Sequence, residues 1–219
     1  IAHLAVDLEV YGKVGDEMID WDDQPMDPGE QTRYRALAAR LNFLAVDRPD
    51  LLYAAKECSR RTSCPRNRDW EALKRVCQYL IACPRMVHSY RWQDEPNTIT
   101  VYSDSDWAGC RETRKSTSGA CFFHGDHLIK AYSKTQANIA LSSAEAEYYS
   151  MVKAASEGLG LKAMTMDYNK PLSPWMFVDA TAAIGVAQRV GLGKLRHLET
   201  QTLWLQESVR DKRIGLSKV

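Results

Sequence analysis

Three acidic side chains stand where an apolar strand ends or a helix begins, the positions at which a fold can aim a carboxylate. TVYSDSDW ends a strand-like run on Asp104, LSSAEAEYYS opens a helix around Glu147, and WMFVDATAAI ends a second apolar strand on Asp179. Carboxylates that converge repel one another unless a cation lies among them, and hard divalent ions favour oxygen ligands. The pattern therefore predicts a site for Mg²⁺, with Mn²⁺ as an alternative. Two such ions about 4 Å apart can hydrolyse a phosphodiester.

Two of these acids have a close neighbour that competes for the same role. Asp104 lies at the end of the strand and Asp106 in the turn that follows, so position favours Asp104. Glu145 and Glu147 are about 200° apart around a helix and cannot both face one site. Ser142 and Glu145 fit a capping box, which gives Glu145 a structural role, while Glu147 borders the apolar face of the helix.

Each acid also has a purely structural interpretation. An Asp at the position of Asp104 can form a turn with its own backbone, and an Asp at the position of Asp179 can cap the helix that follows. Glu147 can be an ordinary surface residue. The occurrence of all three together favours the metal site.

The pattern of apolar residues after Asn97 predicts an α/β domain that could hold these acids. Three strands come first, and the turn His124-Gly125-Asp126-His127 joins the second to the third, so its histidines are interpreted as turn residues rather than metal ligands. The order β-β-β-α-β-α-α-β indicates a mixed sheet with helices packed against it. The expected elements are residues 98–103, 118–123, 128–133, 143–166, 175–178, a helix from about 180, then 197–210 and 214–219.

Upstream of this domain the sequence predicts a linker and a small helical unit. Thr32 can cap the first helix, and Pro49 suits the first turn of the second. The three helices are expected at residues 32–46, 49–61 and 69–82. Residues 16–30 are typical of a linker, and no strand or helix is expected to fix their aspartates, which favours a solvated acidic loop over a metal site. These are Asp20, Asp22, Asp23 and Asp27.

Bulk composition places few limits on function. The 219 residues suit one or two domains, and the formal net charge of +1 shows no general excess of cations, although charge can be local. There is no run long enough to span a bilayer and no secretory signal, and a start at Ile1 is typical of a fragment or a processed product. The cysteines form no CxxC pair, which favours reduced intracellular thiols over a zinc site. They are Cys58, Cys64, Cys77, Cys83, Cys110 and Cys121.

Several multi-residue motifs resemble one family in their order and spacing. YSDSDWAG, RKSTSG, YSKTQ and ALSSAEAEYYS are similar to the ribonuclease H domain of Ty1/copia-type retrotransposon polyproteins. YRALAARLNFLAVDRPDLLYAAK and DWEALKRVCQYL resemble the segment that joins reverse transcriptase to ribonuclease H in that family. The resemblance implies a poorly defined segment and acidic linker at residues 1–31, a helical reverse transcriptase connection at 32–95 and a ribonuclease H domain at 96–219.

The resemblance implies an enzyme that uses two Mg²⁺ ions to hydrolyse the RNA strand of RNA–DNA hybrids during reverse transcription. Asp104, Glu147 and Asp179 match the family's catalytic and metal-binding acids, with Asp104 bridging the ions. The family usually has Asn after the third acid, where this sequence has Ala180, so a supporting contact differs. The implied partners are the hybrid and the remainder of the Pol polyprotein, without a membrane, and the implied location is intracellular, in a cytoplasmic virus-like particle or the nucleus.

In the family a fourth acid lies on a helix after the last strand, which is expected here at residues 214–219. The sequence therefore predicts a chain truncated just before this ligand and weakly active or inactive, with Glu199 as an alternative fourth acid. Basic and polar residues near the acids are candidates to contact phosphates and 2′-hydroxyls of the hybrid. These are Arg114, Lys115, Ser116, Thr117, Lys134, Lys194 and Arg196.

Two other functions stay open at this point. One is a catalytically inactive relic or nucleic-acid-binding module, which a missing fourth acid would favour. The other is an integrase or resolvase-type nuclease of the same architecture. The final acid of such a nuclease comes from a late helix, whereas Glu147 is the second acid here and lies on the first helix of the α/β domain. Fold alone does not separate these alternatives, so the motifs decide in favour of ribonuclease H.

Overall fold

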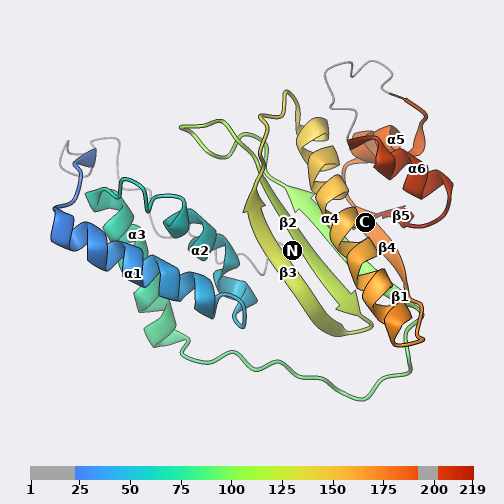
Figure 1. Ribbon diagram of the computed structural model, residues 1–219, viewed down its shortest axis with the longest axis horizontal. Helices are drawn as coiled ribbons and strands as arrows, with labels where there is room; N and C mark the ends of the chain where they lie inside the picture. The colour runs from blue at the N-terminus through green and yellow to red at the C-terminus, as the bar shows by residue number, and fades with distance from the viewer. Residues whose placement is uncertain (1–22, 192–201) are drawn as a thin grey trace. The chain divides into compact units, whose positions relative to one another are not determined.

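The computed structural model describes residues 23–191 and 202–219, which fall into two compact units. One unit ends at His88, and the other comprises Ser89–Val219 (Figure 1). The expected α/β architecture, a mixed sheet with flanking helices preceded by a small helical unit, is confirmed. Within these two ranges, the structure contains no helix that is both long and apolar enough to cross a membrane.

The first unit is helical. It consists of α1 (Pro28–Leu44), the 3₁₀ turn η3 (Pro49–Leu51), α2 (Leu52–Ser59) and α3 (Asn67–Ala82). The helices enclose a core of their own, in which Tyr34 and Leu51 are almost completely buried. The Tyr34 hydroxyl donates a hydrogen bond of 2.8 Å to the carbonyl oxygen of Cys58, which satisfies the polar end of a buried aromatic side chain.

Helix α1 begins earlier than the sequence pattern predicted. The expected cap, Thr32, lies inside the helix, and Asp27 caps it instead. One Asp27 oxygen, Oδ1, accepts the N–H groups of Gly29 (2.7 Å) and Glu30 (3.0 Å). Pro28 suits the first helical position because it has no N–H to satisfy.

The expectation that no helix fixes the aspartates of the linker is therefore wrong for Asp27. Asp23 is also held, because its carboxylate forms ion pairs with Arg66 and, at 2.9 Å, with Arg68. Asp20 and Asp22 lie outside the described residues.

The second unit is built on a five-stranded sheet. Its strands are β1 (Thr98–Ser105), β2 (Thr117–His124), β3 (His127–Thr135), β4 (Ser173–Val178) and β5 (Gly215–Lys218), in the spatial order β3-β2-β1-β4-β5. The first three strands are antiparallel, and β4 and β5 run parallel to β1. The predicted turn between β2 and β3 is confirmed, with Gly125 in the left-handed region at φ 59°.

Helix α4 (Ser143–Asp167) crosses one face of the sheet, as Figure 1 shows. Its residues Tyr148, Met151 and Ala155 are buried against Ile99 and Val101 of β1 in one apolar core. Two shorter helices, α5 (Thr181–Gln188) and α6 (Trp204–Arg210), add to this core. The predicted helix at 197–210 is thus described only from its second half. The packing fixes the N-terminal turns of α4 relative to the end of β1.

Candidate metal centre

Two of the three acids reach the same edge of the sheet because their strands are parallel neighbours. In the pairing of β1 with β4, Tyr102 lies opposite Phe177. Asp104 and Asp179 each follow two residues after this pair, so they occupy equivalent positions at the carboxyl ends of adjacent strands. Adjacent strands are about 4.8 Å apart, which brings two carboxylates together without any special loop.

The third acid comes from the start of α4. The Ser142 hydroxyl accepts the N–H of Glu145 at 3.2 Å, and the Glu145 carboxylate accepts the N–H of Leu141 at 2.9 Å. Glu145 therefore has the capping role that the sequence suggested, although its carboxylate bonds the residue before the cap rather than the cap itself. Glu147, two positions later, faces the end of β1.

The structure brings Asp104, Glu147 and Asp179 together. One carboxylate oxygen from each residue lies within 4.8 Å of the other two. Asp104 and Asp179 are exposed, whereas Glu147 is only 7% exposed. Among the described residues no other group of three acidic, histidine or cysteine side chains has such an arrangement.

Only one of the two carboxylate oxygens of Glu147 has hydrogen-bond partners among the described residues. Its Oε1 accepts hydrogen bonds from the backbone N–H (3.0 Å) and the hydroxyl (3.1 Å) of Ser105. Its Oε2 is buried and has no hydrogen-bond partner in the described part of the chain. Burial is the main reason that the pKa of Glu147 rises to about 7, and the charges of Asp104 and Asp179 raise it further.

Asp104 experiences the same effects more weakly. Although the Asp104 residue is exposed, the surrounding protein removes part of the hydration of its carboxylate. This desolvation, followed by the charge of Asp179, raises the pKa of Asp104 above its ordinary value. The backbone of Asp104 is anchored to α4, because the Ser150 hydroxyl donates to the Asp104 carbonyl oxygen at 2.8 Å and lies 2.9 Å from the Ser103 hydroxyl. These buried serines hold the strand end and the helix in a fixed relation.

Asp106, the competitor of Asp104, has a structural role. Its N–H donates to the carbonyl oxygen of Thr117 at 3.1 Å, and its own Oδ1 accepts the N–H of Thr117. The side chain thus continues the pairing of β1 with β2 beyond the last strand residues. It is not a member of the acidic cluster.

The residues present fit divalent cations. Three carboxylates supply oxygen ligands of the kind that Mg²⁺ and Mn²⁺ prefer. The unpaired Oε2 of Glu147 is the clearest sign, because a buried carboxylate oxygen without a partner is costly unless something else bonds it. Asp104, Glu147 and Asp179 would hold the ions.

The candidate nucleic-acid contacts are differently placed. Arg114 is exposed and Lys115 partly so, in the turn before β2. Ser116 is fully buried, and its hydroxyl accepts the N–H of Ala108 at 3.0 Å, so that side chain is used inside the chain. The N–H of Thr117 bonds Asp106, as described above.

Lys134 is exposed at the end of β3. It lines an open cavity of about 200 Å³ together with Gln136, Asn138 and Lys153. Lys153 also forms an ion pair with Glu157. The remaining candidates, Lys194, Arg196 and the alternative fourth acid Glu199, lie outside the described residues.

Sequence reasoning missed Ser105. This residue donates both its N–H and its hydroxyl to Glu147 and is the only residue between two aspartates in the run SDSD. A small hydroxyl residue directly after a proposed metal ligand was a usable signal, since such side chains often orient ligands through a further hydrogen bond. The long-range pairing with α4 could not be seen in the sequence.

Comparison with known proteins finds relatives of this chain among transposon polyproteins. The chain is 32% identical over 186 residues to the retrovirus-related Pol polyprotein from transposon RE2 of Arabidopsis thaliana, a match that covers 83% of this chain and 13% of that protein. It is 37% identical over 130 residues to the corresponding polyprotein from transposon RE1 of the same plant, covering 58% of this chain and 9% of that protein. The relatives of this chain are thus retrovirus-related Pol polyproteins from plant transposons. The chain spans a small part of the length of these relatives.

Among solved structures, this chain is similar to LC11-RNase H1, a protein isolated from compost. The two share 14% sequence identity with a TM-score of 0.38, over 56% of this chain and 84% of LC11-RNase H1. No family model matches the chain.

Proposed function

We propose that this chain is a retrotransposon ribonuclease H that hydrolyses the RNA strand of RNA–DNA hybrids. The observation that carries the proposal is the convergence of three carboxylates where β1 and β4 end and α4 begins. One of them, Glu147, is buried and has an oxygen without a hydrogen-bond partner among the described residues. Similarity to retrovirus-related Pol polyproteins from transposons supports the same role. The helical unit would be the connection to a reverse transcriptase.

The chain's own residues would prepare the site in two ways. Asp104 and Asp179 present their carboxylates from rigid strand ends, so little side-chain order is lost when a ligand binds. Ser105 holds one oxygen of Glu147, and the other has no hydrogen-bond partner among the described residues. When bound, divalent cations would supply an activated water and neutralise charge on the leaving oxygen. Exposed Arg114 and Lys134 would contact phosphates of the hybrid, inside the cell that carries the transposon.

The test is cleavage of an end-labelled RNA–DNA hybrid by the purified chain in Mg²⁺ and in Mn²⁺. We expect cleavage of the RNA strand only, and a loss of at least about a hundredfold in rate for Asp104→Asn and for Glu147→Gln, since both remove a charged ligand without changing shape. Glu207→Gln is the matched control. Glu207 is an exposed glutamate of α6, and its variant should cleave at the unaltered rate.

Other outcomes of the same assay would replace the proposal. Cleavage of duplex DNA would favour an integrase or resolvase-type nuclease. Binding of the hybrid without cleavage in either metal would favour an inactive relic or a nucleic-acid-binding module. Hybrid cleavage that survives Asp104→Asn would show that the acidic cluster is not the site.

A further inference from the structure

We infer that the turn between β2 and β3 is a clasp that binds the segment entering the sheet unit, residues 90–93. The amide side chain of Gln93 forms two hydrogen bonds with the backbone of the turn. Its Nε2 donates to the carbonyl oxygen of His124 at 2.9 Å, and its Oε1 accepts the N–H of Asp126 at 2.9 Å. The His127 ring completes the clasp, because its Nε2 lies 2.8 Å from the carbonyl oxygen of Arg91 and its Nδ1 lies 3.2 Å from Gln93 Nε2.

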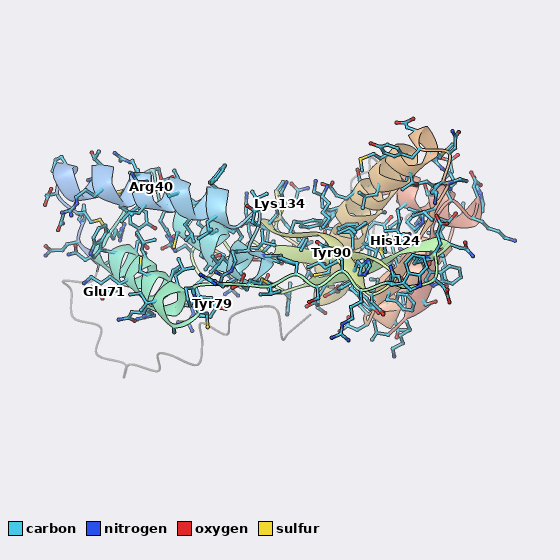
Figure 2. The ribbon with its side chains drawn as sticks, turned by 90° about the horizontal axis from the view of Figure 1, so that it is seen from below. Arg40, Glu71, Tyr79, Tyr90, His124 and Lys134 are labelled. Atoms are coloured by element: carbon cyan, nitrogen blue, oxygen red, sulfur yellow. The ribbon has the colours of Figure 1, made fainter. Side chains whose placement is uncertain are left out.

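The donors and acceptors of this clasp are complementary. The Arg91 carbonyl can only accept, so His127 Nε2 must donate. In a neutral ring Nδ1 is then an acceptor, which suits the second proton of the Gln93 amide. The Tyr90 ring adds an edge-to-face contact with His127 at 5.2 Å between centroids. Figure 2 labels Tyr90, in the bound segment, and His124, at the start of the turn.

A glycine at position 125 is required for the Gln93 side chain to lie against the turn. A Cβ at this position would lie 2.2 Å from the Gln93 Oε1, closer than any van der Waals contact allows. The residue also has φ 59°, which favours glycine. The His127 ring and the His124 carbonyl of the HGDH turn therefore have a use beyond forming the turn.

Polar contacts rather than burial hold the segment. Trp92, in the middle of it, is 94% exposed, and Arg91 is exposed as well. A segment held by a few hydrogen bonds can be released by the loss of one side chain, whereas a segment held by a buried apolar face cannot. We therefore expect residues 90–93 to be able to leave the turn and to bind it again.

The clasp sets the length of chain that joins α3 to the sheet unit. Helix α3 ends at Ala82 and β1 begins at Thr98. With the clasp closed, the sheet unit effectively begins at Tyr90, and only residues 83–89 connect it to α3. Release would add residues 90–94 to this connection, up to the ion pair of Glu95 with Lys170. The reach of a flexible chain increases with the square root of its length.

Limited trypsin digestion of the whole chain tests the clasp, because it offers a site inside the clasp, Arg91, and an exposed reference site outside it, Arg85. We expect Gln93→Ala to accelerate cleavage after Arg91 by about tenfold, the effect of losing one to two hydrogen bonds, and to leave cleavage after Arg85 unchanged. His127→Phe, which keeps a ring beside Tyr90 but loses both hydrogen bonds, should act in the same direction.

The control is Asp94→Asn, an exposed neighbour of Gln93, which should leave both sites as they are. Hydrogen exchange of the Asp126 amide gives a second measurement, since Gln93→Ala removes its acceptor and should raise its rate about tenfold while amides of β1 stay protected. An unchanged rate after Arg91 in Gln93→Ala would overturn the clasp. So would an equal acceleration at Arg85, because it would indicate general loosening.

Discussion

Helix α4 carries two glutamates whose surroundings are opposite. Glu147, near its start, is buried beside Asp104 and Asp179, and its pKa rises to about 7. Glu157, farther along the same helix, has Lys130 at 2.6 Å from one oxygen and Lys153 at 2.9 Å from the other. Hydrogen bonds from these lysines lower the pKa of Glu157 to about 2.

The difference identifies which of the two sites is incomplete. Glu157 is neutralised by cations of the chain itself, so it needs nothing from outside. Glu147 lies among like charges, and one of its oxygens has no hydrogen-bond partner among residues 23–191 and 202–219, so its ionised form is costly until a cation arrives. A folded chain tolerates such a cost mainly at functional sites, where ligand binding recovers it.

The largest expected effect concerns Glu147 without metal. Because its folded pKa is raised above the ordinary value of 4.5, its contribution to stability is present in full below pH 4.5 and is lost as pH rises through 7. In EDTA, Glu147→Gln should therefore exceed the original chain in free energy of unfolding by on the order of 3 kcal/mol at pH 8. Urea denaturation of both proteins at several pH values measures this difference.

The advantage of Glu147→Gln should shrink steadily towards pH 4.5. Subtracting one protein from the other at each pH removes the contribution of all other titrating groups. A difference that is constant with pH would show that packing, not charge, distinguishes the two proteins.

The next largest effect is stabilisation by divalent cations. Mg²⁺ at a hundred times its dissociation constant should raise the free energy of unfolding by about 2.7 kcal/mol, because the ion binds only the folded chain. Asp104→Asn should lose most of this gain, and Glu157→Gln should retain it. Thermal melts at increasing Mg²⁺ provide the measurement, and an equal response from Asp104→Asn would argue against binding at the cluster.

Much of this comparison could be anticipated from the sequence. Asp104 and Asp179 were predictable because an acid directly after an apolar strand lies at a sheet edge, and Glu147 because a helix separates it from Glu145 by about 200°. The catalytic role assigned to these acids stays a prediction. The distance between them depends on β1 and β4 being parallel neighbours, which a single sequence does not reveal.

Other features could not be anticipated, for physical reasons. The Gln93 clasp joins residues about thirty positions apart through polar atoms. Such isolated polar contacts produce no periodic pattern in the sequence from which they could be predicted. The early start of α1 was different, because Asp27 followed by Pro28 is a recognisable helix start. There the acidic composition of the surrounding linker outweighed a correct local signal.

The smallest expected effect concerns Glu157. Its folded pKa is lowered, so its contribution to stability is present above pH 4.5 and is lost as pH falls towards 2. Lys130 and Lys153 are 40% and 42% exposed, so solvent screens the pairs and the loss for Glu157→Gln at pH 7 should be about 1 kcal/mol, far below what the pKa alone suggests. Urea denaturation in low salt and in 0.5 M NaCl tests this, since screening at a Debye length of about 4 Å should diminish the difference. A loss above about 2 kcal/mol that salt does not alter would mean that Glu157 acts through packing, and the contrast with Glu147 would then not be one of charge.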